Sequence, residues 1–185
     1  MAQRAVTGEQ RRWSSDALLD AVLPGHGGEM APVIGFGISQ DRNATPPIVN
    51  PHGFSVEWLR LAASLKVGRH LCESVQVLMV FKGSLEVTYN RQGEEVTIVA
   101  TERSVISVPA NCWRTYRALD GDMEATLTTQ GDQRKRLNWD ETLLEEARKL
   151  NRCLDPDGYV TKANILPSTA RRASVKIERL PSTTI

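Results

Sequence analysis

Residues able to bind a metal or move a proton gather in two short stretches of the chain. The stretch 70–76 contains His70, Cys72 and Gln76, and a second stretch ends in Cys112, Trp113 and Arg114. An imidazole or a thiolate can ligate a metal, a glutamine carbonyl is a weak ligand, and a protonated guanidinium has no lone pair to give. Taken singly, each residue also has a structural interpretation, because buried cysteines often act as small hydrophobes.

The rest of the sequence offers few other catalytic groups. His26 and His52 lie in loops rich in glycine and proline, where we expect surface positions. The sequence contains no glycine-rich phosphate loop, no nucleophile elbow and no HExxH helix. These observations argue against several common enzyme classes.

Composition narrows the class of protein further. Hydrophobic residues make up 41% of the 185 residues and charged residues 24%, with a formal net charge of +1. These values are ordinary for a globular domain and predict no nucleic-acid or membrane partner. Neither a secretory signal nor a membrane-spanning run is evident. Three cysteines without a CxxC pair then indicate reduced thiols, so the predicted location is cytoplasmic.

The elements that must position the candidate residues are short strands. Apolar and polar residues alternate in several runs separated by turn signals about every 10 residues, as is typical of a sandwich or barrel. A hairpin is expected around the turn at 90–93. The predicted strands cover 32–37, 54–61, 75–81, 85–89, 96–100, 105–108 and 123–129.

The two ends of the chain differ from this β-rich centre. Residues 1–27 are expected to form a mobile tail (1–13) and a short helix capped by Ser14 or Ser15, and 28–132 to form the barrel. Residues 133–162 should contain an amphipathic helix and a turn, with Asn138 and Glu141 at the spacing of a capping box. Residues 163–185 are expected to form a C-terminal tail.

The central residues resemble the cupin superfamily. Its first motif is Gly-x5-His-x-His-x(3,4)-Glu-x6-Gly, which aligns His70, Cys72, Gln76 and Gly83 in this chain. Its second motif is Gly-x5-Pro-x-Gly-x2-His-x3-Asn, which aligns Arg103, Pro109, Asn111 and Arg114. The resemblance implies a double-stranded β-helix, or jelly-roll barrel, and the C-terminal segment is similar to that of some dioxygenase-like cupins.

The same resemblance implies a lumen site in which the metal ligands are degenerate. The corresponding metal set is His70, Cys72 and Gln76, and the metal is either absent or a divalent Fe, Ni, Mn or Zn ion. The candidate ligand-binding residues are His70, Cys72, Gln76 and Arg114, together with Trp113, which is expected to pack or to line the mouth beside Arg114. A buried guanidinium needs an anion or several acceptors, unless its side chain extends to the solvated rim.

Three functions follow as alternatives. The favoured one is a metal-poor cupin that binds a small anionic or aromatic organic ligand or serves as a structural barrel. The second is a metal-dependent oxidoreductase similar to quercetinase-like dioxygenases. The third is a metal-free isomerase or cyclase, with His70 as acid or base and Arg114 stabilising an oxyanion. We also expect a homodimer, with segment 28–50 and its run Pro32–Phe36 as a pairing edge.

Overall fold

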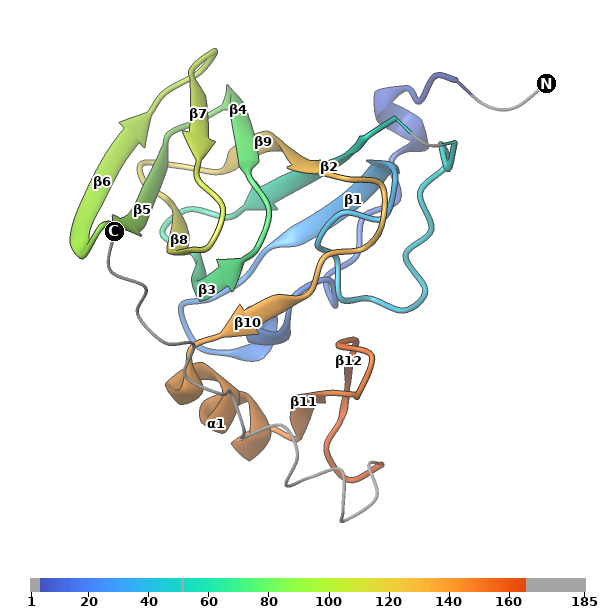
Figure 1. The fold of residues 1–185 in the computed structure, drawn as a ribbon, viewed down its shortest axis with the longest axis vertical. Helices are drawn as coiled ribbons and strands as arrows, with labels where there is room; N and C mark the ends of the chain where they lie inside the picture. The colour runs from blue at the N-terminus through green and yellow to red at the C-terminus, as the bar shows by residue number, and fades with distance from the viewer. Residues whose placement is uncertain (1–3, 51, 166–185) are drawn as a thin grey trace.

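Runs with alternating buried and exposed side chains form two five-stranded antiparallel sheets in the computed structural model, which describes residues 4–50 and 52–165 (Figure 1). The first sheet has the order β1 (Glu29–Ile34), β2 (Phe54–Leu61), β9 (Met123–Gln130), β4 (Gln76–Lys82) and β7 (Val105–Val108). The second has the order β10 (Leu137–Trp139), β3 (Lys66–Cys72), β8 (Cys112–Ala118), β5 (Leu85–Arg91) and β6 (Glu94–Ala100).

The sheets enclose a core formed by the inward side chains of both. Leu59, Leu78 and Leu127 come from the first sheet and Val87 and Tyr116 from the second, and all are at most 1% exposed. Burying apolar surface of this kind is the main favourable term in folding. The predicted all-β barrel of two facing antiparallel sheets is confirmed.

Three strands of the two large sheets were not predicted from alternation: β3, β8 and β10. Their buried positions include His70 and Arg114, which do not register as apolar residues in a hydrophobicity pattern. The residues of greatest chemical interest therefore lie on the strands that the apolar pattern could not reveal. By contrast, β2 and β7 have the predicted bounds, and the β5–β6 hairpin turns where expected.

The N-terminal predictions need correction. Two 3-10 helices, η1 (Gly8–Gln10) and η2 (Leu19–Val22), occur where a tail and a capped helix were expected. The segment is held against the barrel rather than loose, because Arg11 pairs with Glu124 and stacks over the Trp58 ring. The Asp20 carboxylate accepts a hydrogen bond from the Gly68 amide at 2.6 Å, which fixes η2 on β3.

The C-terminal boundary also moves. Strand β10 pairs with β3, so the barrel extends past residue 132, and Asn138 is a strand residue rather than a helix cap. Helix α1 (Glu141–Lys149) is capped instead by Asp140, whose side chain accepts from the Thr142 amide. A hairpin of β11 (Arg152–Leu154) and β12 (Val160–Lys162) follows α1 below the barrel (Figure 1). Of the predicted tail, residues 166–185 lie outside the described residues.

Strand β1 is less available for pairing than expected. Its outer edge is bridged by Ser14 at Met30 and by Ile48 at Ile34, so the chain itself satisfies much of this edge. The run Pro32–Phe36 is therefore a poor site for a partner strand. In the described ranges, no helix is both long and apolar enough to cross a membrane.

Candidate functional site

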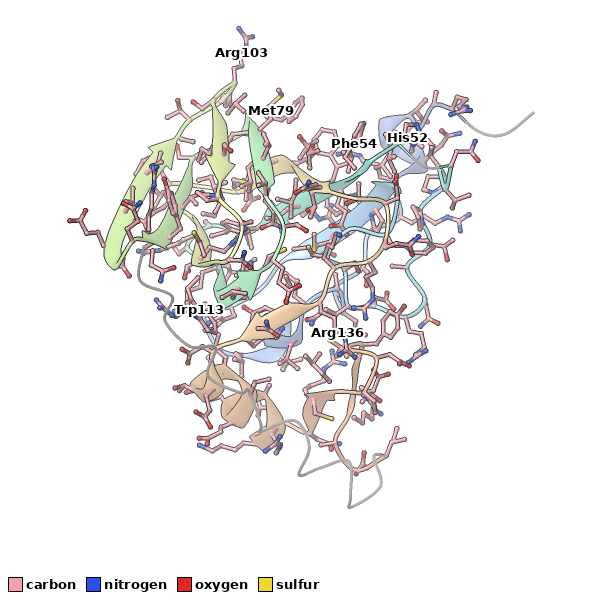
Figure 2. The ribbon with its side chains drawn as sticks, in the orientation of Figure 1. His52, Phe54, Met79, Arg103, Trp113 and Arg136 are labelled. Atoms are coloured by element: carbon pink, nitrogen blue, oxygen red, sulfur yellow. The ribbon has the colours of Figure 1, made fainter. Side chains whose placement is uncertain are left out.

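The four positions that align with motif glycines share one backbone conformation, although only one of them is a glycine. Ser64, Gly83, Arg103 and Asn111 stand at the four glycine positions, and their φ values are +66°, +74°, +65° and +57°. This left-handed conformation favours glycine because it lacks a Cβ atom. The shared φ values therefore place the motifs in register, with Arg103 at the exposed tip of the β6–β7 turn (Figure 2).

The structure buries four of the predicted residues inside the barrel. His70 and Cys72 come from β3, Gln76 begins β4 in the other sheet, and Arg114 comes from β8. His70 and Arg114 are direct partners in the β3–β8 ladder. None of the four is more than 1% exposed, so Arg114 does not extend to the rim.

Arg114 is held entirely by neutral acceptors. Its Nη1 donates to Gln76 Oε1 at 2.7 Å, and its Nη2 donates to the carbonyl oxygens of Cys72 at 3.0 Å and Pro109 at 2.9 Å. Its Nε donates to the Cys112 carbonyl at 3.0 Å. No Arg114–carboxylate ion pair occurs among the described residues. The cation is thus hydrogen-bonded but not neutralised.

Two polar residues of this cluster were missed from sequence. The Tyr116 hydroxyl donates to Gln76 Oε1 at 2.8 Å, and Gln76 Nε2 donates to Thr129 Oγ1 at 3.3 Å. Tyr116 lies two residues after Arg114 on β8, so strand alternation could have placed it on the same face. Burial raises the pKa of Tyr116 far above its usual value, which keeps the hydroxyl protonated.

His70 has one satisfied and one unsatisfied nitrogen. Its Nδ1 lies 2.8 Å from the Gly68 carbonyl, whereas Nε2 is buried without a hydrogen-bond partner. The rings of Tyr116 and Trp139 pack against it at 5.4 Å between centroids. Burial, with a smaller contribution from the Arg114 charge, lowers the pKa of His70 to about 4, so the imidazole is neutral at pH 7. Nδ1 then carries the proton, and Nε2 is an acceptor.

These residues do not fit the metal that cupin motifs imply. Both hydrogen bonds to Gln76 Oε1 point at the oxygen that would have to ligate, and the Arg114 charge repels a cation. Burial raises the pKa of the Cys72 thiol, which disfavours the ligating thiolate. Over the described ranges, no group of three or more His, Cys, Asp or Glu could hold a metal ion.

Trp113 is not brought together with the other predicted residues. It follows Cys112 and precedes Arg114 on β8, so it points to the outer face (Figure 2). There the Arg69 guanidinium lies 5.3 Å from its ring centroid. A role for Trp113 in lining the lumen is therefore not supported.

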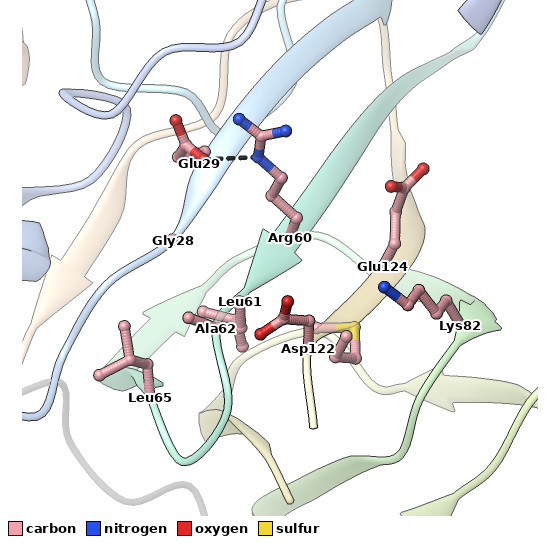
Figure 3. Close-up of a pocket in the computed structure, with 10 residues that line it drawn as sticks. Gly28, Glu29, Arg60, Leu61, Ala62, Leu65, Lys82, Asp122 and Glu124 are labelled. Carbon is pink, nitrogen blue, oxygen red and sulfur yellow. Dashed lines mark hydrogen bonds and ion pairs between the residues drawn. The ribbon is translucent and has the colours of Figure 1, made fainter. Parts of the chain in front are cut away.

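A surface pocket of about 370 Å³ lies elsewhere, near the ends of β2 and β4 (Figure 3). Charged side chains of both signs line it, among them the Arg60–Glu29 pair at 2.5 Å. None of the candidate residues lines it. This pocket is separate from the lumen cluster.

No protein-family model and no curated protein sequence matches the chain. Among solved structures, it is similar to an oxalate oxidase with a TM-score of 0.52 and 13% identity over 64% of this chain and 57% of that chain. A mutant oxalate decarboxylase from Bacillus subtilis gives a TM-score of 0.50 and 15% identity, over 70% of this chain and 31% of that chain. A cupin superfamily protein from Desulfitobacterium hafniense gives a TM-score of 0.39 and 14% identity, over 45% of this chain and 72% of that chain.

The likeness to the oxalate oxidase and the oxalate decarboxylase concerns the fold: the chain has the double-sheet barrel fold of the cupin superfamily. It spans little more than half of the oxalate oxidase chain and under a third of the oxalate decarboxylase chain. At such low identity the likeness concerns the fold, and the chemistry must come from the residues of this chain.

Proposed function

We propose that this cupin barrel binds a small organic anion in its lumen without a metal. The observation that carries the proposal is the buried Nε2 of His70, which has no hydrogen-bond partner in the barrel. Leaving a buried acceptor unpaired costs about 1–3 kcal/mol. A ligand with a hydroxyl or another donor would satisfy this nitrogen.

The negative charge of the ligand follows from Arg114. A buried cation whose acceptors are all neutral keeps an unfavourable self-energy, and a nearby anion offsets part of it. Four of the five guanidinium N–H groups have protein acceptors, which leaves one N–H on Nη1 for a ligand. The aromatic rings beside His70 favour a flat molecule. A phenolic or hydroxylated carboxylate combines these features.

The two enzymatic alternatives have less support. A metal-dependent dioxygenase needs a ligand set that Gln76 and Arg114 no longer provide. A metal-free isomerase needs a competent base, but a histidine with a pKa of about 4 accepts a proton poorly at pH 7. Ligand binding requires neither a metal-ligand set nor a basic histidine, so it is the function that His70 and Arg114 support best.

Salicylate and benzamide, added to protein dialysed against a chelator, test the proposal. Salicylate provides a hydroxyl donor and a carboxylate on one ring, whereas benzamide is a neutral ring of similar size. We expect salicylate to bind more tightly than benzamide by at least tenfold in isothermal titration. His70→Phe should weaken salicylate binding and reduce this preference while keeping an aromatic ring, and His52→Phe, in an exposed loop, should keep it. Equal binding of both probes, or salicylate binding unchanged in H70F, would contradict the proposal.

For the assembly we propose a homodimer through the outer face of β4. Val75, just before β4, and the outward positions of the strand form an apolar row of Val75, Val77, Met79 and Phe81, three of which are 38–49% exposed. Glu73 lies exposed before the row, and Lys82 lies exposed at its end. A two-fold axis through the row would bring the acidic end of one copy to the basic end of the other. This charge complementarity favours a second copy of the chain as the occupant.

A further inference from the structure

Two of the three cysteines lie directly opposite each other on neighbouring strands. Cys72 ends β3, Cys112 begins β8, and the two are paired in the antiparallel ladder. Residues paired in this way have Cα atoms about 4.5–5.5 Å apart. A disulfide spans Cα separations of about 4.4–6.8 Å, so the backbone can accommodate one without rearrangement.

Both thiols also lie on the inner face of the second sheet. Cys72 is buried on the same side of β3 as His70, and Cys112 is buried on the same side of β8 as Arg114. The two are not joined by a disulfide in the structure. Cys112 is 8% exposed and Cys72 is fully buried, so a small oxidant reaches Cys112 first.

Arg114 fixes the two cysteines relative to each other. Its guanidinium donates to the carbonyl oxygens of both Cys72 and Cys112, each at 3.0 Å. The same cation favours the thiolate of Cys72, although burial outweighs it and raises the pKa of that thiol overall. Cys72 therefore suits the role of the second, resolving thiol better than that of the first nucleophile.

We propose that Cys72 and Cys112 are a redox-sensitive pair that closes to a disulfide in the presence of a peroxide. In the first step the Cys112 sulfur attacks one oxygen of hydrogen peroxide, the O–O bond breaks, and a sulfenic acid and one water form. In the second step the Cys72 sulfur displaces the hydroxyl group from Cys112. The S–S bond forms, the S–O bond breaks, and the thiol proton leaves in a second water. Two thiols are oxidised by two electrons while one peroxide is reduced to two waters.

The Cys72–Cys112 pair lies at the end of the barrel where β3 ends and β8 begins. The Pro109 carbonyl, which also accepts from Arg114, lies in the turn that leads into Cys112. A covalent link between β3 and β8 would hold this turn against β3. The proposal concerns thiol chemistry alone and does not depend on a ligand in the lumen.

Peptide mapping of the full-length folded protein tests it. The protein is treated with hydrogen peroxide, alkylated with iodoacetamide in denaturant without reductant, and cut with trypsin. Cys72 then lies in the fragment 70–82 and Cys112 in the fragment 104–114. We expect these fragments joined, with the loss of two hydrogen atoms, in more than half of the molecules. Cys153, on the separate β11–β12 hairpin, should remain alkylated and serves as the internal control.

Cys72→Ala and Cys112→Ala variants should each lose the joined fragment. Because either substitution could disturb folding, the decisive result is that of the wild-type chain. The proposal is overturned if the folded wild-type protein keeps both cysteines alkylated, or oxidises Cys112 to the sulfinic acid without the link. Linkage that forms only after unfolding in urea would overturn it as well.

Discussion

The Arg114 guanidinium on β8 donates to the Gln76 carbonyl oxygen on β4 at 2.7 Å, which joins the two sheets through the middle of the barrel. Cupin motifs have a histidine and a glutamate at these two positions, where they would meet a metal. In this chain the two side chains meet each other. The interaction accounts for the polar interior of the barrel without any ion.

Removing Arg114 is therefore expected to destabilise the fold. Arg114→Met keeps an unbranched apolar stem but leaves the carbonyls of Cys72, Pro109 and Cys112 without this donor. We expect a loss of about 2–4 kcal/mol in the free energy of unfolding, measured by urea denaturation. Arg117→Met, at an exposed position of the same strand, should change it by less than about 0.5 kcal/mol. An R114M barrel as stable as the wild type would show that the network contributes nothing net.

Restoring the motif residues should restore a metal. The triple variant Cys72→His, Gln76→Glu and Arg114→His places imidazoles and a carboxylate at inward positions beside His70 and removes the cation. We expect it to bind about one equivalent of Mn²⁺ or Zn²⁺ by elemental analysis. Gln76→Glu alone should bind none, because the new carboxylate would pair with Arg114. A folded triple variant without metal would mean that the lumen geometry is not that of a metal site.

Arg103 offers a test of the motif backbone. Its φ of +65° is strained for a residue with a Cβ atom and relaxed for glycine. Arg103→Gly should stabilise the protein by about 0.5–1 kcal/mol, and Arg103→Val should destabilise it by at least as much. Thermal unfolding of the two variants side by side measures the difference. If R103V proved more stable than R103G, Arg103 would not stand at the glycine position of the second motif.

Asp20 should make stability depend on pH. Burial raises its pKa to about 7, well above the value of a carboxyl group in the unfolded chain. The folded state then binds more protons between pH 4 and 7, so this contribution stabilises the protein at low pH and is lost as pH rises through 7. Asp20→Asn retains an oxygen acceptor for the Gly68 amide without titrating. Between pH 5 and 8 it should lose roughly 2 kcal/mol less stability than the wild type, measured by urea titrations. Parallel pH profiles would show that Asp20 does not titrate in this range.

The dimer proposed through β4 predicts a specific sensitivity to charge. Met79→Asp places a carboxylate in the middle of the apolar row (Figure 2), and we expect at least a tenfold weaker dimerisation constant in sedimentation equilibrium. Val99→Asp, at an exposed apolar position on β6, should leave the constant unchanged. A wild-type chain that is strictly monomeric at micromolar concentration would contradict the proposed assembly.

Much of the fold could be predicted from the sequence because apolar and polar residues alternate cleanly in most strands of the two large sheets. Strands β2 and β7 were predicted to the residue, and Gly83 and Pro109 set the motif register. Strands β3 and β8 could not be predicted from alternation, because polar residues occupy some of their inward positions. The extension to β10 was also hidden, because Leu137 and Trp139 alone do not make a periodic run.

The candidate site was only half predictable for a related reason. The motif alignment selected His70, Cys72, Gln76 and Arg114, and the structure buries all four. The acceptors of Arg114 are mostly backbone carbonyls, which carry no signature in the sequence. Trp139 became relevant only once the β10–β3 pairing placed it beside His70, whereas alternation along β8 could have located Tyr116. Trp113 was misplaced because alternation sends it outward.

The central claim is that a hydrogen-bonded guanidinium occupies the lumen in place of a metal ion. Elemental analysis of the wild-type protein, purified without added metal or chelator, tests it most directly. We predict less than about 0.1 equivalents of iron, nickel, manganese or zinc per chain, with His70→Ala giving the same value. About one equivalent of any of these metals in the wild-type protein, lost in H70A, would contradict the account.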